Sequence, residues 1–233
     1  AGLISGASSS KTEYSFLSYF SRVNFDYMAK YLVTIAGRVD GSSRFGSNSR
    51  YGFFPALSVG WVLTKESFLT DNPTLSFLKL RASYGLTGNA GIGNFRHLGL
   101  FGVDSYNGTS GLIPSQIANA DLGWETTRQM DLGIDFGFLK NRISGEIDLY
   151  SKNTNDLLLD VPVPATSGYT VQTQNVGSVT NKGVEFVLNT TNISGDFNWE
   201  TSLNFSYNRN KGPTLGGQQV IDEGSSRFMN VVM

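Results

Sequence analysis

The chain has no cysteine and a single histidine in 233 residues. Without cysteine it cannot form disulfides, thiolate metal sites or cysteine nucleophiles. Charged residues make up only 16%, where a soluble domain usually has about 25%. No apolar run approaches the ~18 residues of a transmembrane helix. The net charge of −1 and the lack of long basic runs give no reason to expect a nucleic-acid partner.

Strict alternation of apolar and polar residues is the main pattern that is present. In the clearest case Leu203, Phe205 and Tyr207 face one side of an extended chain, and Asn204 and Ser206 face the other. The pattern predicts eight strands, at residues 22–27, 31–40, 56–63, 78–87, 130–138, 143–149, 184–189 and 199–208. With their flanking residues they are close to the ~9–11 residues that a tilted strand needs to cross a bilayer. Strands of soluble proteins average only ~5–6 residues.

The predicted links between these strands alternate in length. Short links are expected at 28–30, 139–142 and 192–198, with a slightly longer one around 65–74. Long polar loops are expected at 41–50, 88–123 and 153–183. Short turns on one side and long loops on the other are typical of an antiparallel outer-membrane β-barrel, in which the short turns are periplasmic.

Aromatic residues lie on the apolar side near both ends of the predicted strands. Tyr27, Tyr31, Trp61 and Trp199 are close to short turns, whereas Tyr84, Trp124 and Tyr207 are near the loops. Amphipathic rings concentrate in this way at the two interfaces of a membrane. The alternative is a water-soluble β-sandwich with the rings in its core, but its strands should be shorter and its turns more even.

The polar side of the predicted strands carries most of the charge. The inward set is Arg22, Asp26, Arg38, Asp40, Lys79, Arg81, Asp131, Asp135, Glu146, Asp148, Glu185 and Glu200. Eight strands can close into a small barrel, yet these charges are better solvated in a wide or plugged one. A stand-alone eight-stranded barrel, acting as an anchor or adhesin, is the alternative. By parity Arg128 faces lipid, which costs roughly 2–4 kcal/mol at the midplane and about 0–1 near the interface.

Several sequence blocks resemble one family in the same order. They are YLVTIAGRVDGSSRF from Tyr31, GSNSRYGFFPALSVGW from Gly46, LKLRASYGLTGNAGIGNF from Leu78, DLGIDFGFLKNRISGEIDLYSKNTNDLLL from Asp131, and NVGSVTNKGVEFVLN from Asn175. The last block contains an N-x-G…N-x-G-x-E pattern at Asn175, Gly177, Asn181, Gly183 and Glu185. From about Ser18 to about Lys211, the sequence resembles the SusC/RagA family of TonB-dependent outer-membrane transporters.

This resemblance implies a 22-stranded barrel whose lumen is filled by an N-terminal plug. It also implies a SusD-like surface lipoprotein as partner, energy supplied through TonB, and import of oligosaccharides or peptides in Bacteroidetes-type bacteria. Residues 1–233 are then expected to be part of one barrel domain, without the plug, the TonB box or the final strands. Residues 227–233 are expected to show no closing strand.

The sequence predicts no enzyme, no cofactor and no metal site. His97 stands alone in a Gly-rich loop, and Asp156 with Asp160 is a candidate for binding Ca²⁺ or ordering the loop, the alternative being a solvated loop. Contacts to a ligand or a partner should come from the long loops. The candidates are Asp104, Tyr106 and Asn107 in one loop and Tyr169, Gln172 and Gln174 in another.

Overall fold

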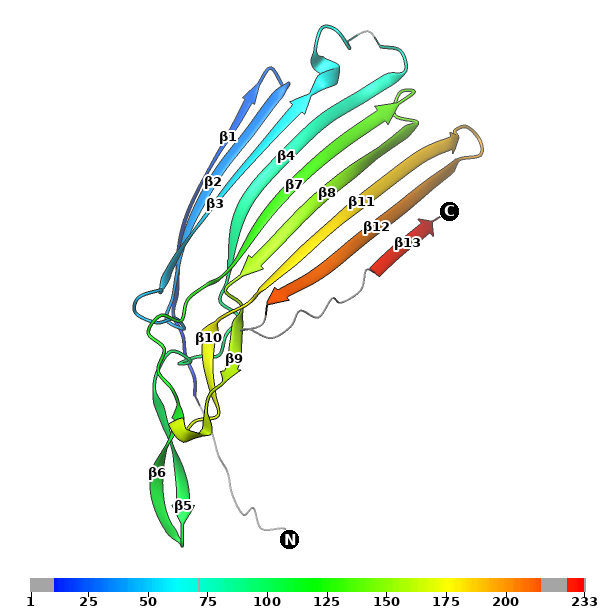
Figure 1. The fold of residues 1–233 in the computed structure, drawn as a ribbon. Coiled ribbons are helices and arrows are strands. Elements are labelled where there is room, and N and C mark those ends of the chain that lie inside the picture. The colour runs from blue at the N-terminus through cyan, green and yellow to red at the C-terminus, as the bar shows by residue number, and fades with distance from the viewer. Residues whose placement is uncertain (1–10, 71, 215–225, 233) are drawn as a thin grey trace, which may run out of the picture.

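The computed structural model describes residues 11–70, 72–214 and 226–232. Their main element is a curved, nine-stranded antiparallel sheet in the order β1-β2-β3-β4-β7-β8-β11-β12-β13 (Figure 1). The strands are β1 (Phe16–Tyr27), β2 (Tyr31–Ser42), β3 (Tyr51–Val62), β4 (Leu75–Asn89), β7 (Glu125–Phe138), β8 (Ile143–Asn155), β11 (Ser178–Ile193), β12 (Trp199–Thr214) and β13 (Ser226–Val232). The all-β, antiparallel fold class is confirmed, and each of the eight predicted strands is present.

Two features of the loops and the C-terminus were not predicted. The long loops contain two hairpins, β5 (Leu100–Tyr106) with β6 (Thr109–Gln116) and β9 (Leu158–Pro162) with β10 (Val171–Asn175). Residues 226–232 form β13, which pairs with β12. The first hairpin had a readable signal, because Asn107-Gly108 turns with φ of 50° and 78°, and Asn-Gly favours such two-residue turns.

The links at one end of the sheet are short and closed by local hydrogen bonds. In the β1–β2 turn, Met28 and Ala29 have φ of 55° and 51°, and the Asp26 carboxylate accepts a 2.7 Å hydrogen bond from the Ala29 amide. The β3–β4 link is longer and begins with the short 3-10 helix η1 (Leu63–Lys65). These links hold the strand pairs in register.

The strands are staggered as in a barrel wall. Tyr31 directly follows a short turn, and its hydrogen-bonded row continues through Trp61, Leu80, Ile134 and Ile147. The row then reaches Phe186, seven residues from the end of β11 at Ile193. A row that lies farther from the short turns on β11 than on β2 means that the strands are tilted, which is the shear that closing a barrel requires.

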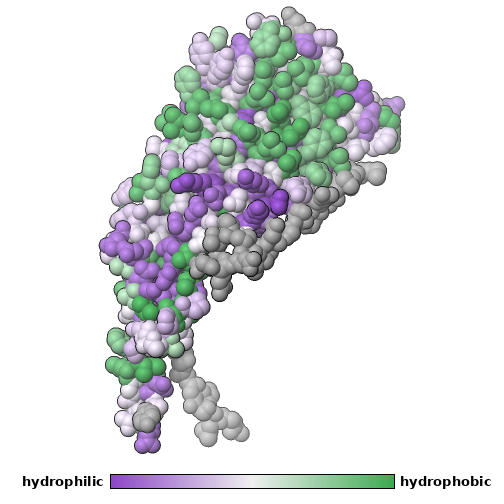
Figure 2. Space-filling view, in the orientation of Figure 1, coloured by the Kyte–Doolittle hydropathy of each residue, from purple (hydrophilic) through white to green (hydrophobic). Residues whose placement is uncertain are grey.

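The two faces of the sheet differ as the alternation predicted. One face carries apolar and aromatic side chains that are exposed, among them Val23, Ile35, Leu57, Leu132 and Leu149. Figure 2 shows this face as an apolar area in the upper part of the molecule, bounded toward the loops by a hydrophilic band. Arg128 shares this face, because it pairs with Leu86, and it is exposed near the loop end of β7.

A small hydrophobic core lies under the long loops. Phe45 and Leu122 are fully buried, and the ring of Trp124 lies 4.8 Å from Phe45 and 5.4 Å from Phe54 between ring centroids. Phe54 reaches this core because β3 pairs with β4 only from Ala56 onward. In the part of the chain that the structure describes, no helix is long and apolar enough to cross a membrane.

Candidate functional site

The polar face of the sheet, which is its concave side and lies opposite the apolar face, carries a connected network of ion pairs. Arg81 on β4 donates from Nε to Asp135 on β7 at 2.7 Å and from one terminal nitrogen to Asp148 on β8 at 2.6 Å. Lys79 reaches Asp135 at 3.2 Å, and Glu146 lies 3.4 Å from Arg81. Arg81 therefore bridges carboxylates of the neighbouring strands β7 and β8, and Lys79 adds a second cation at Asp135.

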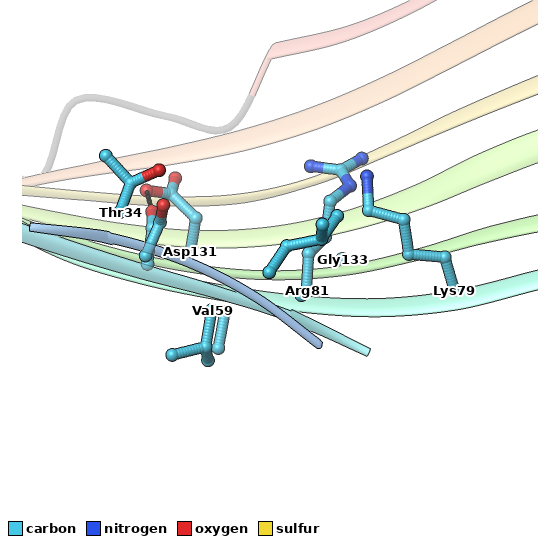
Figure 3. A pocket seen from close by; sticks show the side chains of 11 residues that line it. Thr34, Val59, Lys79, Arg81, Asp131 and Gly133 are labelled. Atoms are coloured by element: carbon cyan, nitrogen blue, oxygen red, sulfur yellow. Dashed lines mark hydrogen bonds between the residues drawn. The ribbon is translucent and has the colours of Figure 1, made fainter. Parts of the chain in front are cut away.

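The network borders a hollow on the sheet. Figure 3 shows Thr34, Lys79, Arg81 and Asp131 on one side of the strands and Val59 on the other. The hollow has a volume of about 360 Å³ and is lined by residues of β2, β3, β4 and β7. Within it the Asp131 carboxylate accepts a 2.9 Å hydrogen bond from the Ser83 hydroxyl. The hollow presents charged and hydroxyl groups to whatever fills the inner side of the wall.

On β11 and β12, this face carries the carboxylates of Glu185 and Glu200 without matching cations on those two strands. Glu185 on β11 stands opposite Asp148 and is exposed, and Glu200 on β12 stands opposite Thr191. Carboxylates placed directly across from each other repel. The arrangement suits hydrogen-bond donors or cations on a partner, and in the described residues no three His, Asp or Glu side chains are grouped to bind a metal ion.

Asn175, in the first half of the family motif, links two loops by hydrogen bonds. Asn175 accepts a 2.8 Å hydrogen bond from the Gly123 amide and donates to the Gly123 carbonyl at 2.9 Å. It also donates to the Asp156 carbonyl at 3.0 Å. Gly177 has φ of 82°, which a residue with a side chain rarely adopts. In this structure Asn175 and Gly177 therefore shape the loop before β11.

The second half of the motif lies in β11 on the concave face. A Cβ on Gly183 would overlap the ring of Tyr150, which lies across it from β8. Asn181 stands opposite Lys152 and Asn210, and Glu185 opposite Asp148 and Ser206. Glycine at 183 is explained by the Tyr150 ring, whereas the structure gives Asn181 no comparable contact.

The predicted loop contacts fall on the two hairpins. Asp104, Tyr106 and Asn107 are at the tip of β5–β6, which points away from the sheet (Figure 1). Tyr169 precedes β10, and Gln172 donates to the Ala118 carbonyl at 3.2 Å while Gln174 donates to Gln172 at 2.7 Å. Gln172 thus links β10 to the segment around Ala118, and Gln174 supports the Gln172 side chain. Contact of these residues with a ligand or a lipoprotein stays a prediction.

The remaining loop candidates, His97 and the pair Asp156 and Asp160, do not form one site. His97 lies 3.1 Å through Nδ1 from the Arg44 carbonyl. Asp160 accepts a hydrogen bond of 2.5 Å from the Thr173 hydroxyl, whereas Asp156 takes φ of 58° in an exposed turn. These contacts order the loops.

Most of the predicted interface aromatics lie on the outer face. Tyr27, Tyr31 and Trp61 form a stacked series with centroid distances of 6.4 Å at each step. Trp199 begins β12 and is exposed, Tyr84 is exposed on β4, and Tyr207 shares its row with Val184. Their contact with lipid remains a prediction.

Trp124 does not fit the prediction for an interface aromatic. Its ring packs against Phe16, Phe45 and Phe54, and its Nε1 donates to the Arg50 carbonyl at 3.1 Å. The reason is that β7 begins only at Glu125, so that Trp124 belongs to the loop core rather than to the alternating strand.

Glu66 is a residue that the sequence pattern did not single out. Its carboxylate accepts hydrogen bonds from the Tyr31 hydroxyl at 2.8 Å and from Trp61 Nε1 at 3.1 Å, and it pairs with Lys30 at 3.3 Å. The Tyr31 hydroxyl, followed by Trp61, holds the pKa of the Glu66 carboxyl below its ordinary value. No periodicity identifies Glu66, because it follows η1 in an irregular link.

Comparison with known proteins identifies the family. Residues 2–228 match the family described as TonB dependent receptor-like, beta-barrel. The chain belongs to this family of outer-membrane receptors. It is 42% identical over 224 residues to TonB-dependent receptor P39 of Formosa agariphila and 41% identical over 219 residues to TonB-dependent receptor SusC of Bacteroides thetaiotaomicron. These matches cover 92% and 88% of the chain, and 22% of each relative.

Solved structures give the same result. The chain matches the RagAB peptide importer in its open-open state with a TM-score of 0.81 and 40% identity over 88% of the chain. The siderophore receptor PirA of Pseudomonas aeruginosa, at 15% identity and a TM-score of 0.55, shares the fold. The match to RagAB spans 22% of that chain, so the present sequence corresponds to about a fifth of the length of these proteins. The predicted resemblance to the SusC/RagA family is confirmed.

Proposed function

We propose that the chain forms part of the barrel wall of an active importer in a bacterial outer membrane. The observation that carries the proposal is the two-faced, staggered sheet, which follows the RagAB peptide importer with a TM-score of 0.81. An apolar outer face suits lipid, and an inner face lined by charges suits a hydrated or plugged lumen. The chain would supply wall and external loops, with transport requiring further strands and a plug.

The open edges of the sheet support a larger barrel. Strands β1 and β13 are the outermost strands in the described sheet. A lipid-exposed edge with unpaired backbone groups is strongly unfavourable in a membrane, so the sheet must close through additional strands. This weighs against a stand-alone eight-stranded barrel acting as an anchor or adhesin, and it favours the 22-stranded barrel that the family resemblance implies.

The transported material is proposed to be an oligosaccharide or a peptide, captured with a SusD-like surface lipoprotein and moved with energy from TonB. Support comes from the names of two relatives, SusC and the RagAB peptide importer. The Asp104–Asn107 tip and the Tyr169–Gln174 segment would contact either the lipoprotein or the ligand. Both lie at the loop side, where a surface partner would approach the barrel.

The first test is the size of the native polypeptide. Outer-membrane fractions of the source bacterium would be separated on a denaturing gel, and the bands would be mapped by peptide mass. The importer proposal predicts these peptides in a chain several times longer, with a plug sequence upstream. A detergent-soluble chain near 25 kDa would overturn it and leave the small barrel.

The second test measures uptake by cells that carry or lack the complete gene. Labelled oligosaccharides and peptides of several lengths would be added with and without a protonophore, which removes the energy source. Uptake that requires both the gene and the proton gradient supports the proposal. Uptake that persists without the gradient would point to a passive pore.

A further inference from the structure

The β5–β6 hairpin has little support from the rest of the described chain. Its two strands form a sheet of their own, and no third described strand pairs with them. Figure 1 shows the hairpin extending away from the nine-stranded sheet. Val103 and Leu112, which pair across it, are 76% and 74% exposed. An isolated two-stranded hairpin is at best marginally stable in water, so this one opens at little cost in free energy.

Asn107 and Gly108 form the turn of this hairpin. They lie between Tyr106 and Thr109, which are the last pair of its ladder. Asn107 and Gly108 have φ of 50° and 78°, and both residues are exposed. A Cβ built on Gly108 would meet no atom within 4 Å. The Asn107 side chain therefore precedes a glycine with open space around its backbone.

An asparagine that precedes a glycine can react with its own main chain, because no Cβ of the next residue hinders the approach. The Gly108 nitrogen gives up its proton to base and attacks Cγ of Asn107, and ammonia leaves as a five-membered succinimide ring closes. Water then opens the ring at either of its two carbonyl carbons. One product is aspartate, and the other is isoaspartate, in which the main chain runs through Cβ and Cγ. In sum, one water enters and one ammonia leaves.

We propose that Asn107 is a site of spontaneous deamidation, at which the tip of the β5–β6 hairpin changes from an amide to a carboxylate. The observations that carry the proposal are the exposed Asn-Gly turn and the weak support of the two strands that hold it. Ring closure draws the Asn107 side chain onto the main chain, so the turn must loosen first. The unsupported hairpin permits this loosening without disturbing the nine-stranded sheet.

The reaction alters the charge and the shape of the tip. Asp104 lies three residues before Asn107, so conversion places a second carboxylate there. Isoaspartate also lengthens the main chain of a two-residue turn, whose geometry sets the register of the hairpin. Because these residues are candidate contacts to a ligand or a partner, binding at the tip would change as the protein ages. Only this last consequence rests on the proposed importer function.

Asp40-Gly41 is an internal control with the same kind of sequence in a different setting. An aspartate before a glycine can form the same succinimide with loss of water. Asp40, however, is only 6% exposed, and its carboxylate accepts a 2.6 Å hydrogen bond from Arg38. Gly41 pairs with Leu17 on β1 and with Tyr51 on β3. The sheet should therefore prevent ring closure at Asp40.

Asn48-Ser49 is a second control, which lies in the loop layer. Asn48 is exposed, but its side-chain amide donates to the Asp121 carboxylate at 2.8 Å. The Ser49 nitrogen, which would have to attack, donates to the Gly46 carbonyl at 3.2 Å. Both reacting groups are thus engaged in hydrogen bonds, so this site should react slowly although it is accessible to water.

The test uses the full-length receptor, purified in neutral detergent and kept in mildly alkaline buffer at growth temperature. Samples taken over days are digested in mild acid and mapped by mass spectrometry, and isoaspartate is detected with an isoaspartyl methyltransferase. Asn107 should convert at least about tenfold faster than Asn48 or Asp40, because weakly held segments open far more often than the sheet or the loop core. Its conversion should accelerate as the pH rises, because the attacking nitrogen must lose its proton.

Two variants check the chemistry. Asn107→Gln should abolish conversion at this position, because its longer side chain would have to close a six-membered ring. Asn107→Asp should yield isoaspartate with no net change in mass. Receptor unfolded in denaturant is the reference, in which all three sites should react. In the folded receptor Asn107 should react within about tenfold of its unfolded rate, since the hairpin opens readily.

Two results would overturn the proposal. One is an Asn107 that stays intact in the folded receptor and converts only in denaturant, which would show that the turn protects it. The other is equal conversion at Asn107, Asn48 and Asp40, which would show that the setting of the turn has no effect. Uptake assays do not enter the readout, so failure of the importer proposal would leave the conversion of Asn107 standing.

Discussion

The sheet and the loop layer of this chain are built against different surroundings. In the sheet, large apolar side chains such as Phe25 and Leu132 are exposed on one face, and no second layer of the described residues covers them. In the loop layer, Phe45 and Leu122 are fully buried by other parts of the same chain. The apolar face of the sheet therefore suits an apolar surrounding such as lipid, whereas the loops form a small core of the kind found in water-soluble domains.

The largest expected effect comes from removing the centre of the loop core. Phe45→Ala should destabilise the loop layer by about 3–5 kcal/mol, since a buried ring is lost and a cavity remains. Hydrogen exchange should show lost protection in residues 42–50 and 119–124, with the strands unchanged. Phe20→Ala is the control, because Phe20 is 81% exposed in this structure. Loss of protection along the whole sheet would show that the two regions do not fold separately.

The next effect tests the outer face. Leu132→Arg places a charge about 15 Å above the short turns, near the bilayer midplane, and should cost about 2–4 kcal/mol. Denaturant titration of the full-length receptor in lipid vesicles measures this cost. Ser144→Arg on the inner face of β8 is the control and should cost much less. Equal costs would mean that the two faces do not differ in environment.

A smaller effect is expected on the inner face. Arg81→Met leaves Asp135 and Asp148 without their shared partner and should cost about 1–2 kcal/mol, since the pairs are partly exposed. Adding Asp135→Asn should recover part of this loss. The measurement is a double-mutant cycle by denaturant titration. Additive costs would show that the two side chains do not interact in the folded protein.

The smallest effect concerns the short-turn end and depends on pH. Because hydrogen bonds lower the pKa of Glu66 in the folded protein, they stabilise it at pH values above the ordinary glutamate pKa. This stabilisation is lost as the pH falls through the lowered pKa. Glu66→Gln should lower the melting temperature by a few degrees at neutral pH, and the difference should vanish in acid. Glu13→Gln, an exposed site, is the control.

The alternation of side chains was sufficient to predict eight of the nine strands of the sheet. Residues such as Leu132, Leu149 and Val184 lie on the apolar face because the period of a strand is two, so their side follows from position alone. The motif residues were found by resemblance, and the structure gives Asn175 and Gly183 contacts that explain them. The charge network around Arg81 was anticipated only as an inward set, without its pairing.

Other features depend on contacts between distant residues. Glu66 meets Tyr31 across 35 positions, and Asn175 meets Gly123 across 52. No local pattern marks such pairs, which is also why Trp124 was assigned to the wrong surroundings. The β5–β6 hairpin is different, because Asn107-Gly108 is a local turn signal that could have been used.

The partial pairing of β3 with β4 has a mechanical consequence. Their ladder covers Ala56–Val62 and Lys79–Gly85, whereas β4 and β7 are paired along nearly their whole length. Near the loops no backbone ladder joins these two strands, and instead the ring of Phe54 on β3 packs over Gly88 on β4 and against Trp124 of the loop core. Under a force perpendicular to the strands, β3 and β4 should separate first at their loop ends. There, aromatic packing rather than backbone hydrogen bonding resists the force.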